Sequence, residues 1–141
     1  MAGTMISTFS KAGAEQDVLP QNGTIKIVLA WTSNSSGAVE QTTARFITGI
    51  LDRVVFVPGG GGSQPTDAYD VTLLDPYGID VLSGQGANLS NALTTEKTPL
   101  MSGTDGTTTA VIPRVLSDQL ELIIVNAGNA KSGTIVLYVR E

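Results

Sequence analysis

The sequence predicts an all-β fold: an antiparallel two-sheet sandwich or jelly roll with a short N-terminal arm. Three observations support this prediction. Several short segments alternate apolar and polar residues with the period of two that a half-buried strand requires. Clusters of Gly, Asn, Asp, Ser and Pro separate these segments, as turns do. The chain has no convincing long amphipathic stretch to supply the crossover helices of an α/β fold.

The clearest predicted strand covers residues 24–31. One face of this segment is apolar at every second position: Ile25, Ile27, Leu29 and Trp31. The opposite face carries mixed side chains: Lys26, Val28 and Ala30. This pattern is typical of a sheet with one face in the core and the other only partly covered.

A second long strand is predicted over residues 46–57, which are rich in branched and aromatic side chains. Gly49 inside it suggests a β-bulge. The next segment, residues 58–67, contains four consecutive glycines and offers no large apolar side chain. We therefore expect a flexible, exposed loop that links two antiparallel strands.

Residues 69–74 alternate again, and the turn residues at 75–78 predict a tight hairpin with residues 79–82. The pattern over residues 84–96 leaves open one or two helical turns, a loop or a strand. Residues 102–109 are a turn-rich link to residues 110–112, where Pro113 indicates an edge strand or a strand end.

The last two strands are predicted over residues 120–125 and 134–140, joined as a hairpin by the polar, glycine-containing residues 126–133. In total we expect about six or seven short strands. The predicted core consists of the inward apolar positions of these strands: Ile25, Ile27, Leu29, Trp31, Ile50, Val54, Val71, Leu73, Val81, Leu120, Leu122, Ile124, Ile135, Leu137 and Val139.

Length and composition fit a single domain. The chain has 141 residues, enough to bury a core without disulfides or metal, and we expect an arm over residues 1–20 and a sandwich over residues 21–141. The net charge of −5 disfavours a nucleic-acid partner, because binding to phosphates requires clustered positive charge. The start shows no signal peptide and no segment approaches a membrane span, so we expect synthesis in a cytoplasm and no membrane partner.

The composition also bears on catalysis. The chain contains no His and no Cys, which excludes imidazole or thiolate nucleophile activation and imidazole or thiolate zinc sites. No Ser stands in a Gly-x-Ser-x-Gly elbow. We therefore expect no catalytic residue, no cofactor and no metal, and a protein that is not an enzyme.

A few side chains still invite a chemical reading. Four carboxylates lie near the predicted hairpin and could offer oxygen ligands to Ca²⁺: Asp67, Asp70, Asp75 and Asp80. A pair such as Asp75 and Asp80 could also serve a glycosidase, which would need a cleft and a fixed separation. We favour turn capping by Asp75 and solvation of the others, because the EF-hand pattern is missing. Gly84 and Gly86 begin like a dinucleotide fingerprint, but Leu89 replaces the third glycine and a turn is favoured. Trp31 is in phase with the core, so we expect it to be structural rather than a sugar platform.

The first twenty residues carry isolated apolar side chains without a strand or helix period: Ile6, Phe9, Val18 and Leu19. Two readings stay open for this segment. It is an arm that becomes ordered when these four residues contact a neighbouring subunit, or it is a frayed chain end. On the first reading these are the partner-binding residues.

Several stretches resemble small virion proteins of tailed bacteriophages. The resemblance is carried by residues 47–55, 69–82, 86–88 and 126–140, and it spans most of the chain after Arg45. Within that group the chain looks most like the head-associated decoration, or cement, proteins of the capsid. The resemblance implies a non-enzymatic subunit on the capsid exterior of the virion that clamps adjacent subunits of the major capsid protein. It also implies a homo-oligomer, with a trimer as one arrangement.

Two alternatives stay open beside this reading. Some relatives within the same group sit on the tail or at the head-tail junction. Residues 31–33 and 69–78 also resemble the sandwich domains that accompany the catalytic part of some secreted subtilisin-like proteases, which implies a stand-alone β-sandwich binding module.

Overall fold

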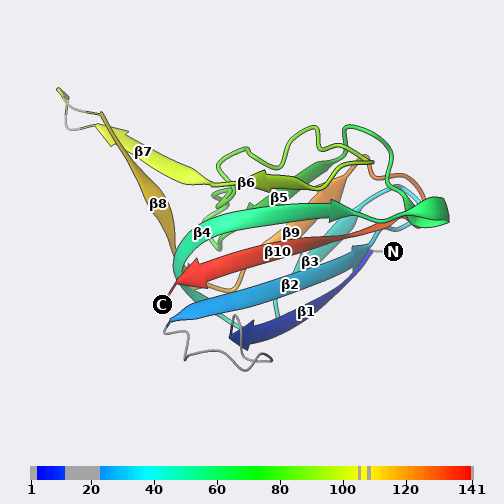
Figure 1. Ribbon diagram of the computed structural model, residues 1–141, viewed down its shortest axis with the longest axis horizontal. Helices are drawn as coiled ribbons and strands as arrows, with labels where there is room; N and C mark the ends of the chain where they lie inside the picture. Colours follow the sequence, from blue (N-terminus) through cyan, green and yellow to red (C-terminus); the bar gives the residue numbers. More distant parts are fainter. Residues whose placement is uncertain (1–2, 12–22, 105, 108, 141) are drawn as a thin grey trace.

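The computed structural model describes residues 3–11, 23–104, 106–107 and 109–140, and it confirms the predicted all-β fold. Two antiparallel sheets pack face to face (Figure 1). The larger sheet has the strand order β1-β2-β10-β4-β8-β7, with β6 also paired to β4, and the smaller sheet has the order β3-β9-β5. The strands are β1 (Thr4–Lys11), β2 (Thr24–Thr32), β3 (Val39–Thr42), β4 (Ile47–Pro58), β5 (Asp70–Leu74), β6 (Thr95–Lys97), β7 (Leu100–Thr104), β8 (Thr109–Asp118), β9 (Glu121–Val125) and β10 (Ser132–Arg140).

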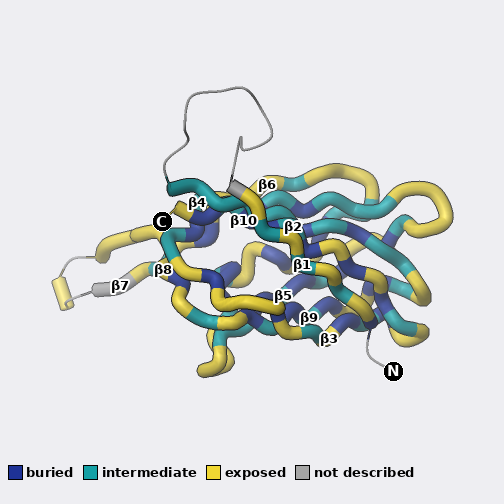
Figure 2. Tube along the Cα trace, turned by 90° about the horizontal axis from the view of Figure 1, so that it is seen from below, coloured by how far each residue is buried: buried dark blue, intermediate teal, exposed yellow. Residues whose placement is uncertain are grey.

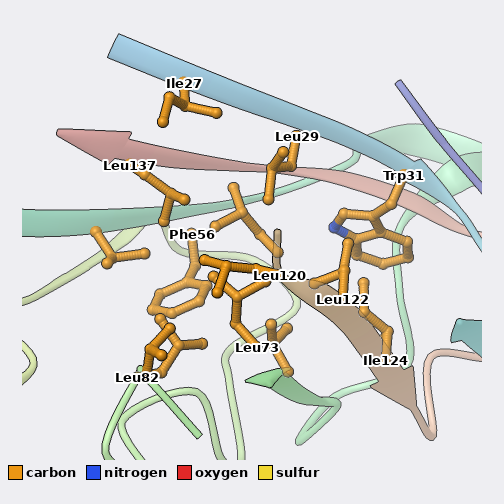
Figure 3. Close-up of a cluster of buried hydrophobic side chains, with 14 of the residues drawn as sticks. Ile27, Leu29, Trp31, Phe56, Leu73, Leu82, Leu120, Leu122, Ile124 and Leu137 are labelled. Carbon is orange, nitrogen blue, oxygen red and sulfur yellow. The ribbon is translucent and has the colours of Figure 1, made fainter. Parts of the chain in front are cut away.

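The core lies between the two sheets, where side chains from both inner faces meet (Figure 3). Strands β9 and β10 bury every second residue, as the sequence alternation predicts. All but two of the predicted core residues are buried. Ile25 is only partly buried against the core, and Ile50 is partly buried on the opposite face of β4.

Ile50 was misplaced because β4 contains a bulge. Tyr138 of β10 pairs with Arg53, whereas the next residue, Val139, pairs with Leu51, which leaves Asp52 as an extra residue. Leu51 and Val54 therefore both face the core although they are three positions apart. The extra residue is held by Arg140, whose Nε donates to Asp52 Oδ1 at 2.7 Å and to Oδ2 at 2.6 Å.

Gly49 marks a close backbone approach, and the β4–β10 bulge lies elsewhere. Its φ of +136° is unfavourable for a side chain, and a Cβ there would collide with the Arg140 carbonyl oxygen. The bulge that was predicted at Gly49 lies at Asp52, three residues further along β4.

Two loops that were expected to join antiparallel partner strands cross from one sheet to the other. Residues 59–69 connect β4 of the larger sheet to β5 of the smaller sheet, and residues 126–131 connect β9 to β10 in the opposite direction. The first loop is anchored by Gln64 Nε2, which donates to Asn91 O at 3.0 Å, and by Thr66 N, which donates to Ala127 O at 2.9 Å. It contains a 3-10 turn, Gly61–Ser63. Because β4 and β5 belong to different sheets, as do β9 and β10, each loop has to cross from one sheet to the other.

The predicted arm is wrong for residues 4–11, which form the edge strand β1 of the larger sheet. β1 pairs with β2 from Thr4 opposite Thr32 to Lys11 opposite Ile25. Met5 and Phe9 pack against the core of the same chain. The open edge of β2 supplies the hydrogen-bond partners that the backbone of this short strand needs. Val18, Leu19 and the expected boundary at residue 20 lie outside the described residues.

The middle of the chain differs most from the prediction. β5 forms as expected, but its predicted partner segment makes only a single bridge, between Leu74 and Asp80. The stretch over residues 84–96, which the pattern left open, contains turns and bends, a single bridge from Leu89 to Tyr69, and the first two residues of β6. Strands β3, β6 and β7 were not predicted.

Candidate protein-interaction surfaces

Strands β7 and β8 form a hairpin that leaves the body of the sandwich. The first half of β8 pairs with β7, from Thr109 opposite Thr104 to Pro113 opposite Leu100. The second half pairs with β4, so the partner of β8 changes just after Pro113. Figure 1 shows β7 and the first half of β8 extending away from both sheets. We call β7 and β8 the projecting hairpin.

The projecting hairpin is apolar although it is exposed. Val111, Ile112 and Val115 keep 59%, 49% and 64% of their surface accessible, and Leu100 at its base keeps 39%. Residues 109–113 are all exposed (Figure 2). Because Val111 and Ile112 are successive strand residues, they point to opposite faces of the hairpin. Exposed apolar clusters of this kind mark protein contacts on soluble proteins.

The base of the hairpin is fixed to the body. Arg114 Nη2 donates to Ser83 Oγ at 2.9 Å, and Ser83 Oγ donates to Leu100 O at 2.8 Å. These bonds tie both hairpin strands to the turn that follows Leu82. The exposed side chains of Val111 and Ile112 therefore lie on the stem of the hairpin, close to an anchored base.

A second apolar surface covers the outer side of the larger sheet. In one row across three strands Val28, Val136 and Val55 lie opposite one another. The neighbouring row contains Ile6, Ala30, Thr134 and Val57. We call the outward side chains of β1, β2, β10 and β4 the valine face. Figure 1 looks onto these four strands, and no described segment crosses in front of them.

The valine face is shallowly hollowed at one end and charged at the other. A hollow of about 300 Å³ opens beside Ile6, Ala30 and Val57. At the other end Lys26 lies opposite Tyr138, whose ring is covered by the Arg53 guanidinium at 4.2 Å. Arg53 also lies 3.9 Å from Glu96. The charges therefore border the apolar rows without interrupting them.

Each of the four aspartates near β5 accepts hydrogen bonds from backbone amides. Asp75 Oδ1 accepts from Tyr77 N at 2.9 Å and Ile79 N at 3.0 Å, which confirms the predicted turn cap. Asp80 accepts from three amides, so its predicted solvation is wrong. Asp67 and Asp70 likewise accept from the amides of Asn91 and Asn88. Within the described ranges no three His, Cys, Asp or Glu side chains are placed to hold a metal ion.

The remaining candidates belong to turns or to the core. Gly84 N donates to Asp80 Oδ2 at 2.9 Å, as part of a turn. Trp31 is buried, 5.7 Å from the ring of Tyr69 between centroids, which confirms its predicted place in the core. Burial also raises the pKa of Tyr69 to about 12. A hydroxyl with this pKa is protonated at neutral pH and is poorly suited to act as a base.

Of the two predicted partner-binding residues that the structure describes, Ile6 and Phe9, only Ile6 lies on a candidate surface. It is 70% exposed at the border of the valine face, whereas Phe9 packs against the core beneath the Arg45 guanidinium, 4.9 Å from the ring centroid. The projecting hairpin was missed by sequence reasoning. Its one signal is the apolar run that ends at Pro113 between two polar segments.

Comparisons with known proteins do not add to this description. No protein-family model, curated protein sequence or solved structure matches the chain. In the part of the chain that the structure describes, no helix is long and apolar enough to cross a membrane.

Proposed function

We propose that this chain is a non-enzymatic structural protein of a tailed-bacteriophage virion, which decorates the capsid exterior and clamps adjacent subunits of the major capsid protein. The observation that carries the proposal is the projecting hairpin, with Val111 and Ile112 exposed on the part that extends from the sandwich and Val115 exposed where β8 pairs with β4. A clamp needs an apolar element that reaches past its own fold, and an anchored base that holds it in position.

The sequence resemblance to decoration proteins supplies the partner in this proposal. Clamping on a capsid lattice repeats one modest contact many times by symmetry, so each single contact can be weak. The excess of carboxylates keeps the free subunit soluble before assembly. Self-assembly into a homo-oligomer is part of the proposal, because several copies on one site would multiply the contacts.

The proposal is tested by sedimenting purified chain with assembled capsid shells that lack it. We expect wild type to co-sediment and Ile112→Asp to lose at least about tenfold in affinity, because a carboxylate would enter an apolar contact. The matched control is Ile79→Asp, because Ile79 is 48% exposed and Ile112 is 49% exposed. Wild type that stays in the supernatant, or Ile112→Asp that binds like wild type, would contradict the proposal.

A further inference from the structure

We infer that the valine face is the contact between two copies of this chain, which pair face to face about a two-fold axis. The inference deepens the homo-oligomer part of the proposed function, and it does not depend on the capsid partner, since it concerns only the chain and its own copies. It starts from two neighbouring rows: Val28, Val136 and Val55, and Ile6, Ala30, Thr134 and Val57.

The side chains of the valine face are well suited to association. Most are Val, Thr or Ala, which are stiff at χ1 or have no rotamers, so little side-chain freedom is lost when they become covered. They come from adjacent strands joined by continuous hydrogen-bonded ladders, from β1 to β4. A surface of this kind changes little between the free and the paired molecule.

The size of the face favours an equally broad and flat partner. Four strands spaced about 4.8 Å apart, with four outward rows about 7 Å apart, give a footprint of about 500 Å². A single added strand or a hairpin would cover only part of it. A second valine face has the same size and shape. The buried area would lie at the lower end of the range for specific protein contacts, which typically bury about 800 Å² per partner.

Two surfaces of the second copy could cover the valine face: its own valine face or the outer face of its smaller sheet. Their charges favour the valine face. The three strands of that sheet carry three carboxylates and no base: Glu40, Asp70 and Glu121. Pairing with it would press carboxylates towards valines and desolvate them. The outer rows of a second valine face are uncharged except at the end with Lys26 and Arg53, and Glu96 of β6 lies at their edge, opposite Val55.

The same charges set the orientation. An axis parallel to the strands would stack the two ends that carry Lys26 and Arg53 on each other and bring like charges close together. An axis that runs across the strands, in the plane between the two faces, reverses the strand direction. The basic end of each copy then lies over Thr4, Thr32 and Ser132 of its mate, which are uncharged.

Sedimentation equilibrium of the full chain tests the inference. We expect a monomer–dimer equilibrium with a Kd on the order of 10 to 100 µM, because the area is small. Ala30→Glu and Ile6→Glu should each weaken pairing at least about tenfold; both positions are exposed, so the fold should tolerate the change. The matched control is Thr72→Glu on the outer face of β5, which should pair like wild type.

Salt dependence separates the two possible partner faces. An apolar two-fold contact should persist from about 0.05 M to about 1 M salt, whereas basic-on-acidic stacking should weaken as salt screens the charges. The inference is overturned by a monomer at concentrations on the order of 500 µM. It is equally overturned by a trimer, by pairing that Thr72→Glu disrupts, or by pairing that survives both Ala30→Glu and Ile6→Glu while the variants melt like wild type.

Discussion

Gly133 on β10 should resist even a single added methyl group, because it faces the indole of Trp31. A Cβ at Gly133 would lie 2.7 Å from Trp31 Cζ2, 2.9 Å from Cε2 and 3.0 Å from the Val57 carbonyl oxygen. Comfortable carbon–carbon contacts lie at about 3.5 to 4.0 Å, so the overlap with the ring is close to 1 Å. Overpacking of this degree costs about 1 to 3 kcal/mol, and the strand preference for Ala over Gly offsets about 0.5 to 1 kcal/mol of it.

We therefore expect Gly133→Ala to lower the free energy of unfolding by about 1 to 2 kcal/mol, as measured by urea denaturation. Trp31 is the only tryptophan of the chain, so its fluorescence follows the packing at this position directly. A double-mutant cycle with Trp31→Leu isolates the clash, because the smaller side chain gives the new methyl group room. Gly133→Ala at wild-type stability, or the same loss in the Trp31→Leu background, would refute the assignment of the strain to the indole.

Three further predictions concern the core and the turns. Burial raises the pKa of Tyr69 from its ordinary value of 10.0 to about 12, so between these values the folded state keeps a proton that the unfolded chain releases. The contribution of Tyr69 to the free energy of unfolding is therefore complete below pH 10 and falls by up to about 3 kcal/mol as the pH approaches 12. In alkaline urea titrations Tyr69→Phe should lack this decline while the exposed control Tyr77→Phe keeps it, and equal slopes for both variants would contradict the assignment. Asp80→Ala should lower stability by about 1 to 3 kcal/mol, because the amides of residues 73, 82 and 84 lose a charged acceptor, and Asp80→Asn should retain part of it; an Ala variant that melts like wild type would count against this cap. Calcium should leave the melting temperature unchanged, since the aspartates near β5 already accept local hydrogen bonds, and a rise of several degrees would reverse that view.

Regular alternation made part of the fold predictable. β2, β9 and β10 each place apolar residues at every second position, and period two allows only one assignment of faces. β4 shows the limit of this reasoning, because the extra residue Asp52 shifts the phase and no local signal announces it. Ile50 was assigned to the core for that reason.

Strand partners were harder to predict than strands. The polar, glycine-rich segments after β4 and β9 have a composition that suits either a hairpin or a crossing to the other sheet. The choice depends on which layer still has an apolar face to cover, and that is a property of the whole chain. β1 was missed for a similar reason, since its few apolar residues show no clear period and the segment becomes a strand beside the open edge of β2.

Candidate surfaces were the least predictable feature. Exposure is decided by what packs nearby, so Phe9 turned inward while Val111 and Ile112 stayed exposed on a hairpin that no second layer covers. Among the predicted contact residues that the structure describes, Ile6 is the one that lies on a candidate surface. The mixed outer face of β2 was expected to be partly covered at most, and Val28 and Ala30 lie on the open valine face.

Cryo-electron microscopy of intact particles that carry this chain tests the central claim most directly. The account predicts density for the two-sheet sandwich on the outside of the capsid, with Val111 and Ile112 of the projecting hairpin buried against the major capsid protein. Particles without this density, or a sandwich whose hairpin points into solvent, would contradict it.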